Sequence, residues 1–147
     1  MNVASSADGN VKDVVPFLRV ASMERSVRYY VDGLGFAMKN TWVVGGKLRW
    51  CWLAIGGAAL MLQEFPREGH DAWLPDGKVG HGVSLVFTCE DAVAIYRDVT
   101  SRGLQASEPE VGNAMWVTSL SDPDGYRIDF ASATDTPEDT KLSEVKS

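Results

Sequence analysis

The chain has 147 residues, of which 45% are hydrophobic and 23% are charged, and this composition is typical of one globular domain or of two small units with a shared core. Its formal net charge is −6 and no basic stripe is visible, which argues against nucleic acid as a partner. No apolar run approaches the roughly 20 residues that cross a bilayer, and residues 1–15 lack the pattern of a secretory signal. We therefore expect neither membrane association nor export.

The two cysteines, Cys51 and Cys89, have neither the spacing of a zinc site nor that of a redox motif. We expect them to be buried thiols in a reducing cytoplasm. The acidic charge is compatible with plain solubility, or with electrostatic attraction of a cationic ligand. Composition thus predicts a cytoplasmic protein and leaves its ligand open.

A polar lead-in (residues 1–13) precedes a first structural unit, which covers residues 14–66. The apolar run that ends at Val20 predicts a β-strand, and Ser22 is a suitable N-cap for a helix behind it. The apolar residues of this helix share one face by their spacing, and they are Met23, Val27, Tyr30, Val31 and Leu34. Gly33 and Gly35 end the helix, and strands are predicted around 38–44, 47–55 and 58–65.

After an inter-module loop (67–80), residues 81–131 repeat this pattern, because positions 20–22 correspond to 89–91 at an offset of 69. A strand leads to a helix that Glu90 or Asp91 caps, and strands are predicted around 104–109, 114–120 and 126–132. Residues 132–147 predict a polar tail that is mobile or loosely docked. The sequence therefore predicts an α+β fold in which two βαβββ modules bury each other's apolar faces in a curved mixed sheet.

The segment Asp122-Pro123-Asp124-Gly125 carries two carboxylates and has the look of an acidic metal loop. Proline at the second position and glycine at a later one are, however, what a tight turn needs. We interpret this segment as a turn.

Residues 16–36, PFLRVASMERSVRYYVDGLGF, resemble the first module of the vicinal oxygen chelate superfamily, which includes glyoxalase I, extradiol dioxygenases and the fosfomycin and bleomycin resistance proteins. FTCEDAVAIYRDVTSRG (87–103) and SDPDGYRIDF (121–130) resemble the second module. The resemblance covers about residues 14–131. It implies paired βαβββ modules around a cup, often in a homodimer, and in the metal-binding members a divalent ion that activates a bidentate oxygen substrate.

By this resemblance, four strand positions hold the metal ligands, and here they carry Val15, Met61, Ser84 and Asp129. Only Asp129 is a strong donor for a divalent metal, and one carboxylate alone makes a poor site. We therefore expect no cofactor. The alternative is a divalent metal such as Mn, Fe, Ni or Zn, bound by Asp129 and rearranged ligands such as Glu64 and His81.

His81 lies three positions before Ser84, so strand alternation turns it away from the cup if the strand extends that far. A β-bulge at one of the flanking glycines would change this. His70 belongs to a polar loop, and Glu64 has the wrong parity relative to Met61, which favours a surface charge at the end of a strand. The histidines are therefore interpreted as bystanders.

The same alternation, with the tryptophans added, predicts these ligand-binding residues: Phe17, Arg19, Trp50, Trp52, Met61, Gln63, Ser84, Thr88, Trp116, Arg127 and Asp129. The tryptophans either stack on a planar or cationic ligand or fill the core or a dimer interface. The two arginines suit an anionic group, although Arg127 has the alternative of pairing with a nearby carboxylate.

The resemblance to the bleomycin resistance proteins implies a metal-independent homodimer that sequesters a drug or metabolite in an aromatic-lined cleft, without catalytic residues. No nucleophile elbow, phosphate loop or dinucleotide motif is present in the sequence. The alternative is a divalent-metal-dependent lyase, isomerase or dioxygenase of the glyoxalase type. A third possibility is a cup filled by side chains in a protein that acts through a partner.

Overall fold

The computed structural model describes residues 9–66 and 79–145, and these residues form the two predicted βαβββ modules. The first module contains β1 (Phe17–Val20), α2 (Met23–Val27), η1 (Arg28–Gly33), β2 (Ala37–Val44), β3 (Lys47–Ile55) and β4 (Ala58–Glu64). The second contains β5 (Ser84–Thr88), α3 (Ala92–Ser101), β6 (Glu110–Gly112), β7 (Met115–Ser121) and β8 (Arg127–Ala133), followed by the short η2 (Leu142–Glu144). The predicted α+β fold is thus confirmed.

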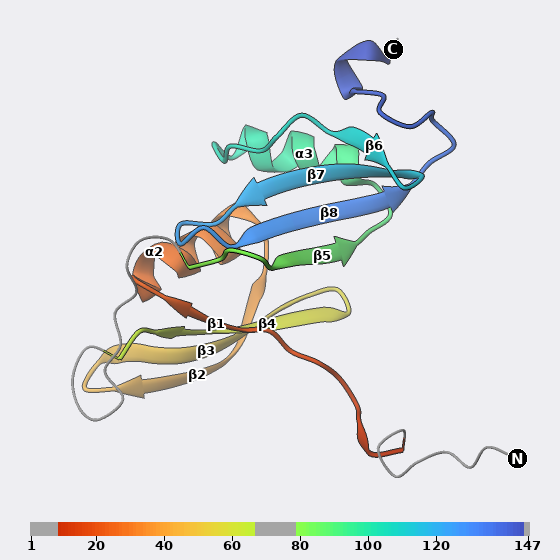
Figure 1. The fold of residues 1–147 in the computed structure, drawn as a ribbon. Coiled ribbons are helices and arrows are strands. Elements are labelled where there is room, and N and C mark those ends of the chain that lie inside the picture. Colours follow the sequence, from red (N-terminus) through yellow and green to blue (C-terminus); the bar gives the residue numbers. More distant parts are fainter. Residues whose placement is uncertain (1–8, 67–78, 146–147) are drawn as a thin grey trace, which may run out of the picture.

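Each module has its own four-stranded mixed sheet, and the two lie in the lower and upper halves of Figure 1. Sheet A has the strand order β1-β4-β3-β2, and sheet B has the corresponding order β5-β8-β7-β6. In each sheet the first strand of the module pairs in parallel with the last, and the other pairs are antiparallel. The internal repeat seen in the sequence is therefore a repeat of topology.

Both helices begin at the predicted positions. The Ser22 side chain accepts a hydrogen bond from the Arg25 N–H at 3.2 Å, and Asp91, rather than Glu90, accepts one from the Ala94 N–H at 2.9 Å. The first helix changes after Val27 into η1, a wider π-helical turn, which the spacing of apolar residues does not distinguish from an α-helix.

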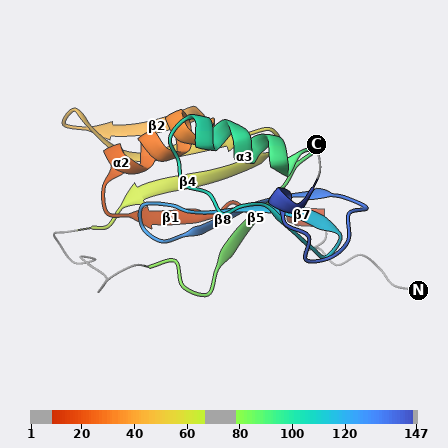
Figure 2. The ribbon, with the colours of Figure 1, turned by 90° about the horizontal axis from the view of Figure 1, so that it is seen from above.

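The hydrophobic core lies on the helix-covered faces of the two sheets, where α2 packs on β4 and α3 packs on β7 and β8. In Figure 2 both helices lie along the same long side of the molecule. Aromatic rings connect the modules in the order Tyr30, Phe36, Phe87 and Phe130, with successive centroids 5.5 to 5.7 Å apart. One continuous core therefore stabilises both modules.

One predicted strand is displaced in the structure. Residues 104–109 were expected as a strand, but the strand at this edge of sheet B is β6; the Ser107 N–H already donates to the Ser119 carbonyl of β7 at 2.9 Å, and the paired residues begin at Glu110, after Pro109, which has no N–H to donate. The polar tail is docked through residue 145: the Asp139 N–H donates to the Val111 carbonyl, the Val111 N–H donates to the Thr140 carbonyl, and residue 141 forms a bridge with residue 110. Of the two alternatives predicted for the tail, mobile or loosely docked, the structure shows docking, and the tail covers the free edge of β6.

Candidate functional site

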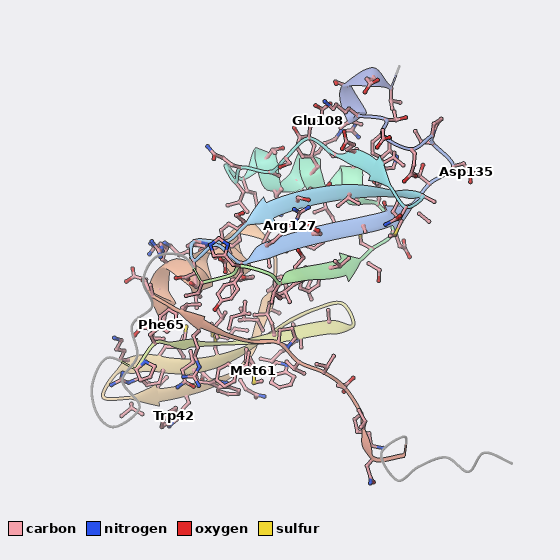
Figure 3. All side chains as sticks on the ribbon, viewed as in Figure 1. Trp42, Met61, Phe65, Glu108, Arg127 and Asp135 are labelled. Carbon is pink, nitrogen blue, oxygen red and sulfur yellow. The ribbon has the colours of Figure 1, made fainter. Side chains whose placement is uncertain are left out.

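Aromatic side chains gather on the face of sheet A that points away from the helices. Strand register brings Phe17, Met61, Trp52 and Asn40 into one row across the sheet, and a second row consists of Arg19, Gln63, Trp50 and Trp42. Residues in register point to the same side. Their neighbours Leu18, Val20, Leu60, Leu62, Cys51 and Leu53 are buried on the opposite side. The side chains of Trp42 and Met61 leave sheet A on the side away from α2 (Figure 3).

We call Phe17, Trp42, Trp50, Trp52 and Met61 the tryptophan face. Trp42 is 56% exposed and Phe17 is 43% exposed, while the other three side chains are half-buried. Large apolar side chains that share one exposed face mark a site of interaction, because burying them in a ligand or partner removes apolar area from water. The tryptophan face is therefore the strongest candidate for the functional site.

A cavity of about 630 Å³ lies at one end of this face, and its lining residues are Trp42, Val44, Lys47, Arg49, Gln63, Glu64, Phe65 and Pro66. This volume falls within the range of small-molecule sites. The guanidinium of Arg19 lies over the Phe17 ring with its central carbon 4.8 Å from the centroid. The face thus combines flat apolar area with cationic and amide groups.

Glu64 does not belong to the tryptophan face. Its carboxylate forms an ion pair with Lys47 at 2.9 Å and accepts a hydrogen bond at 2.9 Å from the Met23 N–H at the beginning of α2. The side chain is only 14% exposed, so the prediction of a strand-end surface charge is wrong. Glu64 caps the beginning of α2, and the alternation of side chains along β4 does not by itself reveal this role as a hydrogen-bond acceptor.

The remaining predicted residues lie on sheet B. Register brings Ser84 beside Arg127 and Val86 beside Asp129, and Thr88 lies farther along the same exposed face of β5. Arg127 donates through Nε to both oxygens of Asp129, at 3.0 and 3.2 Å, and through Nη2 to Ser119 at 3.1 Å. Of the two roles considered for Arg127, the structure shows the ion pair with a carboxylate.

The predicted ligand residues are therefore divided between two sheets. A second cavity, of about 460 Å³, is lined by Arg127, Leu120, the serines 107, 119 and 121, and residues 105–106 on sheet B. Each of the two cavities is lined by residues of one module. Within one chain, then, neither cavity brings the tryptophan face and the Arg127–Asp129 pair together.

Two tryptophans differ from the predicted ligand-binding set, and for Trp116 the structure shows the other predicted role, a side chain that fills the core. Trp116 pairs in register with Ser132 and Val111 and packs against the core, so it lies on the helix-covered face of sheet B, away from the other predicted residues. Trp42 was not among the predicted ligand residues. The Gly45–Gly46 turn pairs Val44 with Lys47, and a bulge near Arg49 then brings Trp42 opposite Trp50. Sequence periodicity offers no signal for this bulge.

The four positions that hold metal ligands in metal-binding relatives do not offer a suitable donor set here. In the part of the chain that the structure describes, no three His, Cys, Asp or Glu side chains lie close enough to hold one ion. Met61 and Ser84 are weak donors for divalent metals, Val15 has none, and Asp129 already accepts two hydrogen bonds from Arg127.

His81 lies in a turn before β5, and its N–H donates to the Val79 carbonyl at 2.8 Å. The strand begins only at Ser84, so the parity argument for His81 does not apply, although the exposed imidazole lies outside the tryptophan face. His70 is outside the described residues.

No helix in the described segments has both the length and the apolar character needed to cross a membrane.

The family is now evident. A model of the Glyoxalase/Bleomycin resistance protein/Dioxygenase superfamily matches residues 12–130, and the chain belongs to this superfamily. This confirms the resemblance seen in the sequence. A search of curated proteins gave no match.

Solved structures share the fold at low sequence identity. A glyoxalase/bleomycin resistance protein from Streptomyces sp. CB03234 is 22% identical with a TM-score of 0.59, covering 79% of this chain and 96% of its own. TnmS3, an antibiotic binding protein from the same organism, is 21% identical with a TM-score of 0.62, covering 84% and 98%. TioX from Micromonospora sp. ML1 is 17% identical with a TM-score of 0.62, covering 86% and 99%. These similarities establish the fold, which hosts both binders and catalysts.

Proposed function

We propose that this protein binds a small, flat organic molecule on the tryptophan face of sheet A and does so without a metal ion. The observation that carries the proposal is the alignment of Trp42, Trp50 and Trp52 on one exposed sheet face. Indole rings offer large, rigid surfaces that stack on planar ligands at little cost in conformational entropy. The similarity to an antibiotic binding protein supports the same class of function.

The donor set supports metal-independence. A glyoxalase-type lyase, isomerase or dioxygenase needs three or more protein ligands around its metal. In this chain the one carboxylate at a ligand position, Asp129, is held by Arg127 and is only 10% exposed. A metal ion at Asp129 would have to compete with the Arg127 guanidinium, which donates to both oxygens of the same carboxylate.

We further propose that two copies of the chain form a cytoplasmic homodimer. Large apolar side chains are exposed on both sheets: Trp42 and Phe17 on sheet A, and Val86 on β5 of sheet B. A second copy would cover part of this area and would add groups to the ligand site that one chain leaves open. Light scattering after size-exclusion chromatography tests this, and a monomer at micromolar concentration would contradict it.

Titration calorimetry with neutral, anionic and cationic naphthalene derivatives tests the binding site. We expect at least one derivative to bind, with an affinity that falls at least tenfold in Trp42→Ala and Trp50→Ala, because each loses a stacking surface. Trp116→Phe is the matched control, since this ring packs in the core. Loss of affinity in the control alone, or no binding to any derivative, would overturn the proposed site.

Elemental analysis tests metal-independence separately. The purified protein is incubated with Mn²⁺, Fe²⁺, Ni²⁺ or Zn²⁺, and free metal is then removed. We expect less than about 0.1 metal ion per chain, because a site with only millimolar affinity loses most of its metal when the free metal is removed. Near-stoichiometric retention that Asp129→Ala abolishes would overturn the proposal and favour the glyoxalase-type enzyme.

A further inference from the structure

Two guanidinium groups beside the tryptophan face have no carboxylate partner among residues 9–66 and 79–145. Neither Arg19 nor Arg49 has a carboxylate oxygen within 4.0 Å in this part of the chain, whereas Arg25, Arg28 and Lys47 each form an ion pair. An unpaired cation in a cleft is an available binding group, because an incoming anion needs no existing ion pair to be broken.

The positions of these arginines suit a ligand that lies on the tryptophans. Arg19 belongs to the same row of the sheet as Gln63, Trp50 and Trp42, and Arg49 lines the 630 Å³ cavity together with Trp42 and Gln63. Adjacent strands lie about 4.8 Å apart, so a bicyclic aromatic body spans two strands of this row. An acidic substituent at one end of such a body would then reach a guanidinium.

The Arg19 side chain also has an aromatic neighbour. The central carbon of its guanidinium lies over the Phe17 ring, 4.8 Å from the centroid, and this contact does not use the hydrogen bonds that the guanidinium N–H groups donate to a carboxylate. A planar carboxylate accepts two such hydrogen bonds at once. Contact with Phe17 is therefore compatible with binding of a carboxylate by Arg19.

Among the described residues that line the cavity, the balance of charge has the opposite sign to the charge of the whole protein. The formal net charge of the chain is −6. Around the cavity, however, Lys47 neutralises Glu64, which also accepts the Met23 N–H, and the positive charge of Arg49 remains. A local positive site in an acidic protein selects anions at short range and repels cations, even though the whole protein attracts cations at long range.

We propose that the ligand is an aromatic organic anion: a planar body that stacks on Trp42 and Trp50, with a carboxylate or similar planar acid that Arg49 and Arg19 bind. This inference rests on the proposed function and adds the charge class of the ligand.

Three probes of one shape test the proposal: 2-naphthoate, 2-naphthylmethanol and 2-naphthylmethylammonium. Their dissociation constants are measured by titration calorimetry at 20 and 500 mM NaCl. We expect the anion to bind at least tenfold more tightly than the alcohol at low salt and the ammonium to bind most weakly. The preference for the anion should shrink at high salt, where the Debye length is only about 4 Å.

Arg49→Gln and Arg19→Gln should reduce the affinity for 2-naphthoate and leave that for 2-naphthylmethanol within twofold. Arg97→Gln is the matched control, because Arg97 is exposed on α3 and its replacement changes the net charge equally. Circular dichroism verifies that each variant is folded. A preference for the anion that survives in both Arg49→Gln and Arg19→Gln would overturn the assignment to these arginines.

The outcomes separate this inference from the function on which it rests. If 2-naphthoate and 2-naphthylmethanol bind with equal affinity and Trp42→Ala weakens the binding of both, the tryptophan site is supported and the proposed charge class of the ligand is overturned. Tighter binding of the ammonium would overturn the charge class as well. No binding of any probe would overturn the site itself.

Discussion

The phenol of Tyr30 donates a hydrogen bond to the carboxylate of Asp122 at 2.7 Å, and this bond joins η1 of the first module to the turn before β8 of the second. Both residues are buried. Asp122 also accepts the N–H groups of Asp124 at 2.9 Å and Tyr126 at 2.8 Å, and Asp124 accepts the Ala21 N–H at 3.0 Å. The turn over residues 122–125 thus connects the modules, which confirms its interpretation as a turn.

Tyr30→Phe should lower the free energy of unfolding by about 2 kcal/mol, because it removes a hydrogen bond to a buried carboxylate. Burial raises the pKa of Asp122, and the Tyr30 hydroxyl counteracts this by stabilising the charged form. Urea unfolding at pH 7 measures the change. Tyr96→Phe on α3 is the control, since no hydrogen bond of the Tyr96 hydroxyl is found in the described part of the chain. Equal losses in both variants would contradict a specific role for Tyr30.

Cys51 should make the stability depend on pH in the alkaline range. Burial raises the pKa of its thiol from 9.0 to about 11. The folded state therefore keeps a proton that the unfolded state releases, so the contribution of Cys51 is complete below pH 9 and is lost as the pH rises towards 11. Relative to Cys51→Ala, the wild type should lose about 2 kcal/mol between pH 8 and pH 11.

Urea unfolding at several pH values measures this difference, and the comparison cancels the titration of groups that both proteins share. Cys89 is retained in both, so its own raised pKa does not contribute to the difference. Parallel curves for wild type and Cys51→Ala would show that the thiol is not shielded from water in solution.

Local sequence signals were sufficient to predict most of the fold. Ser22 and Asp91 cap the helices, and the glycine pair at 45–46 has the positive φ angles that a two-residue hairpin turn requires. Alternation correctly separated the buried Leu18 and Leu62 from their outward-facing neighbours. These features depend on residues close together in the chain, which is why they could be read without the structure.

The site was less predictable because it depends on contacts distant in sequence. The bulge that aligns Trp42 with Trp50 arises from strand pairing, and the capping role of Glu64 from the packing of α2 onto the end of β4. Trp116 lies on the core face, although its residue type is the same as that of the exposed tryptophans. Residue type alone does not distinguish a stacking surface from a core side chain, since burial decides between them.

Gly80→Ala should destabilise the protein by about 2 to 3 kcal/mol. A Cβ atom at this position would overlap the Gly125 carbonyl oxygen and would lie 2.5 Å from the Tyr126 Cα, and backbone atoms cannot move aside as a side chain can. Gly57→Ala is the control, because no atom of the described residues lies within 4 Å of its added Cβ. Thermal unfolding compares the two. An unchanged melting temperature for Gly80→Ala would show that residues 79–82 separate easily from the turn.

The hairpin between β6 and β7 has an unusual turn. Asn113 and Ala114 both have positive φ angles, 53° and 61°, in a two-residue loop that normally favours glycine at the second position. The carboxylate of Glu138 accepts the N–H groups of both residues, at 2.5 and 3.0 Å. The tail thus offsets the strain of Ala114 with two charge-assisted hydrogen bonds.

Ala114→Gly should therefore stabilise the protein by about 0.5 kcal/mol, since relief of a left-handed alanine, worth about 1 to 2 kcal/mol, exceeds the greater entropy of unfolded glycine. Glu138→Gln should destabilise it by about 1 kcal/mol, because a neutral amide oxygen is a weaker acceptor than a carboxylate. The two effects should be coupled, because the turn with glycine needs less support from the tail. Urea unfolding of the two single variants and of the double variant measures this. Glu138→Gln is then compared in the two backgrounds. If it lowers the free energy of unfolding as much in Ala114→Gly as in the wild type, Glu138 does not compensate the strain of Ala114, and its contribution is that of the two hydrogen bonds alone.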